Sequence, residues 1–225
     1  MTPALSIVVP ALDEAAGIAA ALQALAGARA EGAEVIVVDG GSRDATVALS
    51  QALADRVVSA PRGRARQMNA GAAVARAPVL LFLHADTTLP SGGARAALAA
   101  VQAGAAWGRF DVRLEGRSTM LPVIAAFMNA RSRLTGVATG DQAIFVRADR
   151  FRAIGGFPDQ PLMEDIELSS RLKRVSAPAC LRERVVTSGR RWERRGVWRT
   201  VWLMWRLRLR YWLGTPAERL AEAYR

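Results

Sequence analysis

Residues 34–42 read Glu34-Val35-Ile36-Val37-Val38-Asp39-Gly40-Gly41-Ser42. An uninterrupted apolar run of this length is typical of a parallel strand that is buried on both faces. The run ends in a carboxylate and two glycines, at the point where such a strand turns toward the next helix. Because open α/β sheets bind ligands at the carboxyl ends of their strands, this stretch predicts both the fold class and the edge of the sheet that carries the site.

The same pattern repeats on both sides of this stretch. Further strands are expected at 5–9, 56–59 and 79–83, with helices at 15–28, 44–54 and 64–76. The second half continues with helices at 94–103, 118–132, 149–154, 166–175 and 195–213 and strands at 107–114, 142–147 and 181–187. Alternating strands and helices of this size predict an α/β fold, a Rossmann-like and mostly parallel sheet flanked by helices.

Length and composition fit one large globular domain. The chain has 225 residues, of which 51% are hydrophobic and 23% are charged. Its single cysteine, Cys180, excludes an intrachain disulfide framework and fits a reducing compartment. Neither a basic secretory leader nor an apolar run of roughly 20 residues, the length that spans a bilayer, is visible. We therefore expect a cytoplasmic protein with no signal peptide and no transmembrane span.

The turn Asp39-Gly40-Gly41-Ser42 predicts a nucleotide site. Its glycines let the backbone approach a ligand, and the helix that follows favours an anion at its N-terminus. Asp39 can accept hydrogen bonds from a base or from ribose hydroxyls, although a tight turn with Asp39 as a helix cap is the plainer interpretation. The dinucleotide fingerprint Gly-x-Gly-x-x-Gly is absent, which argues against a nicotinamide or flavin enzyme.

A second carboxylate follows the most hydrophobic strand, in His84-Ala85-Asp86. An aspartate at the end of a buried strand is costly unless it binds something. Oxygen ligands suit Mg²⁺ or Mn²⁺, which commonly use one or two carboxylates together with substrate phosphates. We interpret His84, the only histidine, as a site residue beside Asp86, although a lone histidine is more often structural.

Two further motifs lie downstream. Glu164-Asp165 opens a helix, where acidic residues are ordinary partners of the helix dipole or, in the functional interpretation, a general base for an attacking sugar hydroxyl. Gly189-Arg190-Arg191-Trp192 offers an arginine pair for a departing diphosphate and a tryptophan that can stack on a sugar or a lipid.

Taken in order, these motifs resemble those of the family 2 glycosyltransferases, which are inverting enzymes with the GT-A fold. The matching segments are 6–14, 38–46, 63–71, 83–87, 140–142, 155–157 and 164–165. The resemblance spans roughly residues 5–192, so it implies a glycosyltransferase domain over 1–192 and a tail over 193–225. The sequences of these motifs are similar to those of a bacterial subgroup of short, single-domain members whose acceptors are mostly unassigned.

The resemblance implies a role for each matching residue. Asp165 would be the catalytic base, supported by Glu164, and Asp86 would bind the divalent metal. The nucleotide-sugar side would comprise Pro10, Glu14, Asp39, Gly41, Ser42, Arg66, Asn69, His84, Ala85 and Asp86. The acceptor and diphosphate side would comprise Gly140, Asp141, Gln142, Arg191 and Trp192. The chain departs from the family in having His-Ala-Asp in place of Asp-x-Asp, and in lacking the glutamine that precedes Arg-Trp in processive members.

The tail after residue 192 is basic and rich in tryptophan. The chain carries a net charge of +11, and residues 182–225 alone hold 12 arginines against 4 glutamates. On a helix over 195–213, one stripe would hold Arg195, Arg199, Arg206 and Arg210, and the broad remaining face Trp198, Trp202, Trp205, Leu209 and Trp212. This amphipathic pattern predicts a peripheral contact with anionic lipid on the inner face of the cell membrane. A helix packed on the core is the alternative, and no recognition module supports nucleic-acid binding.

The sequence therefore predicts a metal-dependent inverting glycosyltransferase, using a UDP-sugar or another nucleotide sugar, Mg²⁺ or Mn²⁺, and a hydroxyl acceptor for which a lipid-linked compound would be natural. Two rivals are weighed against it. A nucleotidyltransferase would usually carry a Gly-rich phosphate loop and a lysine where this chain reads Pro10-Ala11-Leu12-Asp13-Glu14. A non-catalytic membrane-surface binding protein would have no need of Asp39, Asp86 and Asp165.

Overall fold

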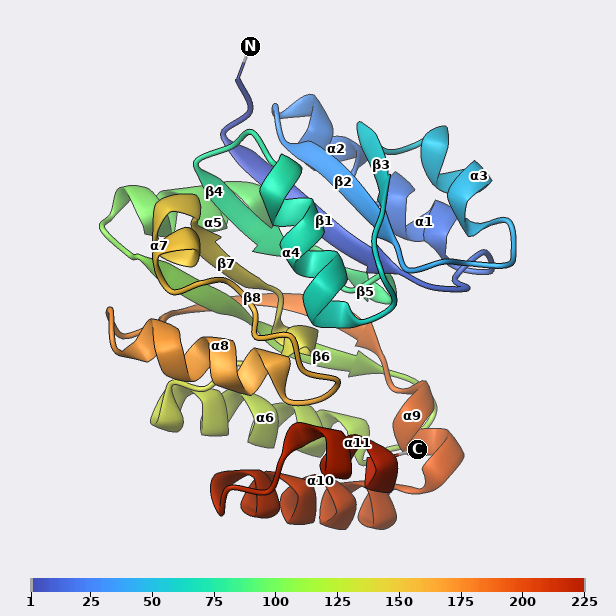
Figure 1. The fold of residues 1–225 in the computed structure, drawn as a ribbon, viewed down its shortest axis with the longest axis vertical. Coiled ribbons are helices and arrows are strands. Elements are labelled where there is room, and N and C mark those ends of the chain that lie inside the picture. Colours follow the sequence, from blue (N-terminus) through green and yellow to red (C-terminus); the bar gives the residue numbers. More distant parts are fainter. Residues whose placement is uncertain (1, 225) are drawn as a thin grey trace.

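The computed structural model describes residues 2–224, except for the side chain of residue 194. In this part of the chain, eight strands form one sheet in the order β3-β2-β1-β4-β7-β6-β8-β5 (Figure 1). The strands are β1 (Leu5–Ala11), β2 (Glu34–Asp39), β3 (Arg56–Ser59), β4 (Val79–Phe82), β5 (Thr87–Thr88), β6 (Trp107–Glu115), β7 (Ile144–Arg147) and β8 (Ala179–Ser188). The helices are α1 (Ile18–Gln23), α2 (Ala26–Ala30), α3 (Thr46–Gln51), α4 (Arg64–Val74), α5 (Gly93–Gln102), α6 (Leu121–Thr135), the 3₁₀ helix η1 (Gly140–Gln142), α7 (Ala148–Ala153), α8 (Glu164–Lys173), α9 (Arg190–Arg195), α10 (Val197–Trp212) and α11 (Ala217–Tyr224).

The strands β1 to β4 are mutually parallel, as the sequence predicts. β1 lies between β2 and β4, so that Val8 is opposite both Ile36 and Phe82. β7 is antiparallel to its neighbours β4 and β6, whereas β8 runs parallel to β6. The expected α/β fold with a mostly parallel sheet is confirmed. The helix expected at 15–28 is divided into α1 and α2, and β5, η1 and α11 were not foreseen.

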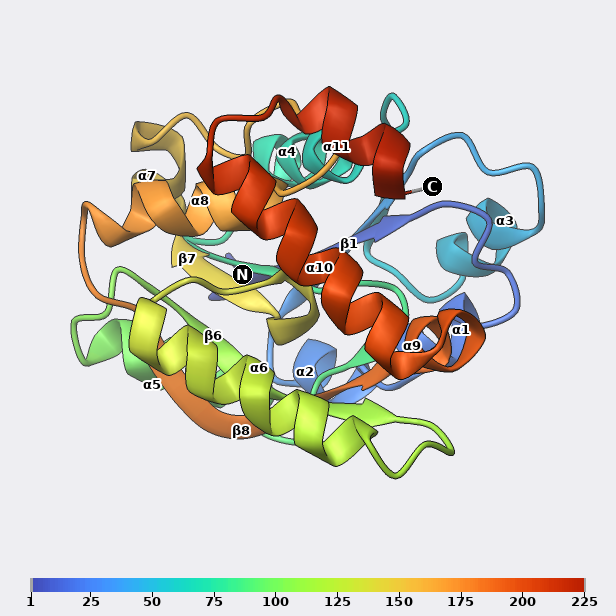
Figure 2. The same cartoon turned by 90° about the horizontal axis from the view of Figure 1, so that it is seen from below.

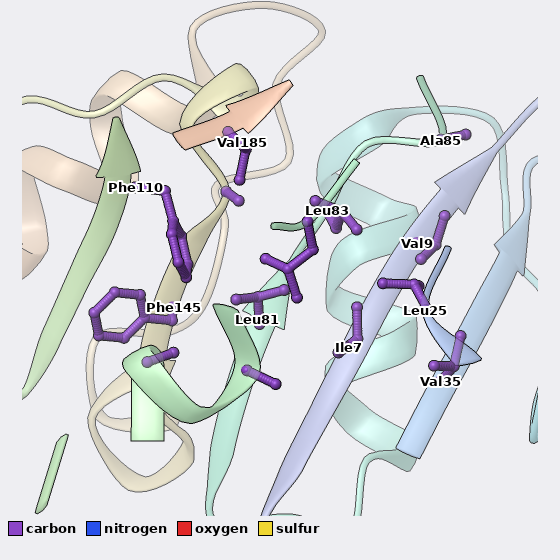
Figure 3. Close-up of a cluster of buried hydrophobic side chains, with 14 of the residues drawn as sticks. Ile7, Val9, Leu25, Val35, Leu81, Leu83, Ala85, Phe110, Phe145 and Val185 are labelled. Atoms are coloured by element: carbon purple, nitrogen blue, oxygen red, sulfur yellow. The ribbon is translucent and has the colours of Figure 1, made fainter. Parts of the chain in front are cut away.

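Alternate residues of the central strands enter two separate cores. Ile7 and Val9 point to one face, together with Leu81 (Figure 3), and α1, α5 and α6 cover that face. Val8 and Phe82 point to the other face, which α4, α7 and α8 cover. Because both faces are covered, the polar residues at the carboxyl ends of these strands are the ones left to meet a ligand.

A buried carboxylate joins the opposite, amino-terminal ends of the strands. Glu34 is 2% exposed and accepts hydrogen bonds from Ser6 Oγ at 2.7 Å, Arg76 Nε at 2.7 Å and the Arg76 backbone N at 3.1 Å. Burial acts to raise the pKa of Glu34, but the hydrogen bonds and the charge of Arg76 outweigh it and lower the pKa below its usual value. The ionised carboxylate therefore ties β1, β2 and the segment after α4 together.

The C-terminal helix expected at 195–213 is interrupted. Gly196, with φ of 80°, separates α9 from α10. Leu207 of α10 is fully buried and packs with Leu162, Met163 and Leu220 of α11. α10 is therefore anchored on the protein by one side.

The other side of α10 is open to solvent. Its exposed apolar residues are Trp198, Trp202, Trp205, Leu209 and Trp212. α10 and α6 lie across the same face of the molecule (Figure 2). Within residues 2–224, no helix combines the length and the apolar character needed to cross a membrane.

Candidate functional site

A cavity of about 890 Å³ opens at the carboxyl ends of β1 and β4. Pocket volumes in this range are typical of sites that bind small molecules. One wall is polar and contains the predicted residues Pro10, Glu14, His84, Ala85, Asp86, Asp141 and Arg191. The opposite wall is formed by α6 and α10. The edge of the sheet and the C-terminal helix, which are distant in sequence, thus enclose one cavity.

Two carboxylates at the strand ends share one cation. Arg190 Nη2 lies 3.3 Å from Glu14 Oε1 and 3.4 Å from Asp86 Oδ2. This shared contact shows that Glu14 and Asp86 can serve a single positive charge, so the pair suits a hard divalent ion that takes one or two carboxylates and completes its shell with substrate phosphates. Among the described residues, no group of three or more His, Cys, Asp or Glu side chains could hold a metal by itself.

Asp39 stabilises the turn after β2 and does not itself line the cavity. It is 5% exposed, and its carboxylate accepts hydrogen bonds from the backbone N of Gly41 at 3.0 Å and of Ser42 at 3.1 Å. Ser42 Oγ in turn accepts a hydrogen bond from Asp13 N at 2.9 Å. Gly41 has φ of 91°, a left-handed conformation that favours glycine. Asp39 therefore shapes the loop, and Ser42 ties it to the loop after β1.

The structure places two predicted residues of α4 away from the cavity. Arg66 Nε lies 2.7 Å from the carboxylate of Asp159, and both side chains are exposed. Asn69 exchanges two hydrogen bonds with the backbone of Phe157, at 2.8 and 3.0 Å. Asn69 thus fastens α4 to the segment after α7.

Arg64 and Gln67 are the α4 residues that line the cavity. Gln67 Nε2 donates to the carbonyls of Ala11 and Val38, both at 2.8 Å, and so braces the ends of β1 and β2. Burial opposes the charge of Arg64, but nearby carboxylates, with Glu164 foremost, raise the pKa of Arg64. Arg64 and Gln67 are three residues apart, a spacing that places both on one face of α4, so the sequence itself contained a signal for this part of the wall.

The 3₁₀ helix η1 brings Asp141 to His84. His84 Nδ1 lies 3.5 Å from Asp141 Oδ1. Gly140 packs so closely on the imidazole that an added Cβ would lie 2.4 Å from His84 Cε1. Burial would raise the pKa of Asp141, but the hydrogen bond and charge of His84, helped by nearby arginines, lower it to about 2.

The acidic pair begins α8, behind Asp141. Glu164 is 6% exposed, and burial, followed by the negative charge of Asp165, raises the pKa of Glu164. Asp165 Oδ2 accepts a hydrogen bond from Gly140 N at 2.8 Å, and Oδ1 accepts one from Ile166 N at 2.8 Å. Glu164 and Asp165 line a small second pocket with His84 and Gly140 instead of the main cavity.

Left-handed backbone accompanies three of the site motifs. Asp13, Ala143 and Met163 have φ of 52°, 46° and 65°. They directly adjoin Glu14, Gln142 and Glu164. Such conformations cost about 1–3 kcal/mol each in residues other than glycine, and they are found preferentially at functional sites.

Of the remaining predicted residues, one supports η1 and two line the cavity. Gln142 is fully buried and donates from Nε2 to Ser132 Oγ at 3.0 Å, so it supports η1. Arg191 and Trp192 line the cavity, and the Arg191 guanidinium lies 5.1 Å from the ring centroid of Tyr224.

Two arginines that motif matching did not single out line the cavity from α6 and α10. They are Arg131 and Arg208. Burial and then the charge of Arg208 lower the pKa of Arg131 to about 10, whereas the negative charge of Asp165 acts to raise the pKa of both arginines. The two guanidiniums therefore face the same cavity, and the charge of Asp165 acts on both.

Comparison with known proteins gives a family match for most of the chain. The model of the family described as "Glycosyl transferase family 2" matches residues 6–155. No curated protein is significantly similar to the chain in sequence.

Solved structures share the fold at low sequence identity. TarS 1-349 from S. aureus, in complex with UDP-GlcNAc, has a TM-score of 0.65 and 16% identity over 82% of this chain and 58% of that one. The mannosyltransferase PcManGT from Pyrobaculum calidifontis, with GDP-Man and Mn²⁺, has a TM-score of 0.61 and 20% identity over 83% and 57%. Glucosyl-3-phosphoglycerate synthase from Mycobacterium tuberculosis, with Mn²⁺ and UDP, has a TM-score of 0.60 and 22% identity over 81% and 70%. The likeness shows the predicted GT-A fold, and the chain spans about 60% of TarS 1-349.

Proposed function

This chain belongs to glycosyl transferase family 2, and from that membership we propose that it transfers a sugar from a UDP-sugar to a hydroxyl acceptor with inversion at the anomeric carbon. The observation that carries the proposal is one cavity that joins the strand-end carboxylates to the α6 and α10 wall. A donor at the strand ends and an acceptor against the helices would meet in the space between them.

The donor is assigned to the strand-end half. The loops after β1 and β2, braced by Asp39 and Gln67, would accommodate the nucleoside. Arg64, Arg190 and Arg191 line the same region and would stabilise the leaving diphosphate, because guanidiniums pair well with phosphate oxygens. The preference for uridine rests on the family and on neighbours whose structures contain UDP.

A divalent cation, Mg²⁺ or Mn²⁺, is assigned to Asp86 with Glu14 beside it. Both carboxylates face the cavity and already share the guanidinium of Arg190. When bound, the ion would neutralise charge that develops on the leaving diphosphate. Two of the solved neighbours contain Mn²⁺.

We assign proton acceptance from the acceptor hydroxyl to Asp165, with Glu164 supporting it. Asp141 is the second candidate, because Asp141 and not Asp165 lines the main cavity. A carboxylate whose pKa is about 2 is a weak proton acceptor, since catalysis favours a base whose pKa is nearer the working pH. Asp141 is therefore better suited to orienting His84, and burial raises the pKa of Glu164, the neighbour that would support Asp165.

We also propose that the face made by α6 and α10 rests on the anionic inner surface of the cell membrane. α10 exposes Trp202 and Trp212 by 63% and 82%, and α6 exposes Phe127 and Leu134 by 70% and 87%. An apolar surface spread over two helices is typical of an interaction site, and tryptophan favours the headgroup level. Arginines at 199, 206 and 210 would add electrostatic attraction that salt weakens.

The catalytic proposal is tested by mixing the protein with a panel of nucleotide sugars and measuring release of nucleoside diphosphate, with Mn²⁺ or with EDTA. Release from a UDP-sugar that EDTA abolishes is expected, and NMR of the product would report the anomeric configuration. Absence of both binding and release for every nucleotide sugar would overturn the proposal.

The membrane proposal is tested by flotation with anionic and neutral vesicles at low and high salt. Leu207 is buried, so removing the tail would uncover the core and point variants are preferable. The double variant Trp202→Ser/Trp212→Ser should lose flotation on anionic vesicles. Leu49→Ser, at an exposed apolar residue of α3, is the matched control. Equal flotation of both variants, or none by the unaltered chain, would overturn the proposal.

A further inference from the structure

The half of the cavity away from the strand ends is built from one face of each of two helices. α6 contributes Val123, Ile124, Phe127 and Met128, and α10 contributes Val197, Trp198, Val201, Met204 and Trp205. Spacings of three and four residues place each set on a single helix face. Both helices lie across the same side of the molecule (Figure 2). Phe127, Trp198 and Trp205 are largely exposed, so this apolar half of the cavity is open to solvent.

Each apolar helix face ends in an arginine. Arg131 stands four residues after Phe127, and Arg208 stands four residues after Met204. Both arginines line the cavity, and the charge of one lowers the pKa of the other. The two cations therefore lie where the two apolar helix faces end, and the charge of one acts on the other.

These cations lack anionic partners. Arg131 Nε and Nη2 are shielded from solvent and have no hydrogen-bond partner among the residues that the structure describes. Arg208 likewise forms no hydrogen bond or ion pair within residues 2–224, and the opposing charges that act on it are those of Asp165 and Asp141. Both arginines are half-buried, and a partly buried cation without a partner is costly, so an anion bound between them would relieve that cost. A phosphate suits this place, because its oxygens can accept from two guanidiniums at once.

We propose that this half of the cavity binds the acceptor, an anionic amphiphile whose apolar chain lies between α6 and α10 and whose phosphate pairs with Arg131 and Arg208. Its hydroxyl-bearing headgroup lies beyond the phosphate, toward Asp165. The assignment as acceptor rests on the proposed sugar transfer, whereas the binding site itself does not. The apolar wall and the arginine pair line the cavity, and the Asp165 carboxylate, whose charge acts on both arginines, lines the adjoining small pocket. The chain, the phosphate and the hydroxyl of such a molecule would occupy these three places in turn.

The test is calorimetric binding of soluble probes to the full chain, without donor. Dihexanoyl phosphatidylglycerol carries chain, phosphate and hydroxyls. Glycerophosphoglycerol lacks the chains, dihexanoylglycerol lacks the phosphate, and inorganic phosphate lacks both chain and headgroup. The complete probe should bind at least about tenfold more tightly than each of the other three, the effect of one hydrogen bond between charged partners or of burying a few methylenes. Equal binding of inorganic phosphate and the complete probe would overturn the proposal.

Variants then locate the probe. Arg131→Met and Arg208→Met should each weaken the complete probe at least about tenfold and leave dihexanoylglycerol unchanged. Val201→Asp should weaken both chain-bearing probes. Arg152→Met, at an exposed arginine of α7 that is not on the cavity wall, is the matched control and should bind like the unaltered chain. Thermal unfolding of each variant shows whether it is folded, and Arg131→Lys, which keeps the charge, serves if Arg131→Met is not.

UDP binding separates this proposal from the proposed function. Arg131→Met and Arg208→Met should keep the UDP affinity of the unaltered chain. If they lose UDP binding instead, these arginines hold the donor diphosphate and the acceptor assignment is wrong. If the chain binds the complete probe but no nucleotide sugar, the proposed transfer fails while the amphiphile site stands.

Discussion

Replacing Asp165 by asparagine removes a proton acceptor and leaves most of the local geometry in place. Asp165 accepts two backbone hydrogen bonds, from Gly140 N and from Ile166 N, both at 2.8 Å. The amide oxygen of asparagine can keep one of them. Losing the other costs about 1 kcal/mol, which lowers a rate by less than about tenfold. Loss of a general base lowers kcat by roughly a hundredfold to ten-thousandfold, so the two explanations predict different magnitudes.

The assay is release of UDP from a UDP-sugar in the absence of added acceptor, where water takes the place of the acceptor hydroxyl. We expect Asp165→Asn to lower kcat by at least about a hundredfold and to keep UDP affinity by calorimetry. Asp141→Asn loses the partner of His84 and should lower kcat by about tenfold or less. Asp159→Asn, at an exposed carboxylate paired with Arg66, is the matched control and should leave kcat unchanged.

The opposite order would refute the reasoning. If Asp165→Asn stays within about tenfold of the unaltered chain while Asp141→Asn falls a hundredfold, the base is the carboxylate on the main cavity wall. The low pKa of Asp141 would then not hold in the complex with substrates. If Asp165→Asn loses UDP binding, Asp165 belongs to the donor site.

Three further predictions follow from the same contacts. Asp86→Asn should nearly abolish Mn²⁺-dependent UDP release, because an amide cannot offset diphosphate charge; activity that survives both this change and EDTA would contradict the metal assignment. Glu164→Gln should raise the free energy of unfolding near pH 7, since the folded-state pKa of Glu164 is raised, and the gain should vanish below its ordinary value of 4.5; urea titrations at both pH values measure it. Arg76→Ala should destabilise the fold by about 1–2 kcal/mol at neutral pH, because Glu34 loses its side-chain donor while Ser6 and the backbone N remain. The lowered pKa of Glu34 means that this loss should shrink as the pH falls below 4.5, and an unchanged loss at pH 3 would contradict it.

The strand-end half of the site could be predicted from sequence, because local pattern fixes it. Apolar runs that end in Asp39 and in Asp86 must deliver those residues to one edge of a parallel sheet. The structure places Asp86 and Glu14 on a single guanidinium there, and it places Asp39 in the supporting turn.

The other half could not be read from local pattern. Arg131 and Arg208 belong to helices whose sequences are about equally compatible with a surface or a cavity wall. What brings them together is the return of α10 to the side of the molecule that α6 occupies (Figure 2), which depends on the packing of Leu207 with Leu162 and Met163 of a distant segment. The tail combines features of both expectations, because one side of α10 is packed on the protein and the apolar other side remains exposed.

The left-handed residues Asp13, Ala143 and Met163 imply that the fold gives up some stability in order to position the neighbouring site residues. At each of these positions the surrounding fold holds the backbone in a conformation that glycine would adopt at no steric cost. Glycine substitutions are therefore expected to relieve strain and also to loosen the loops that carry Glu14, η1 and the acidic pair. A search for heat-resistant variants should therefore recover these glycine substitutions in proteins that are more stable but less active, as is common where activity depends on a strained site.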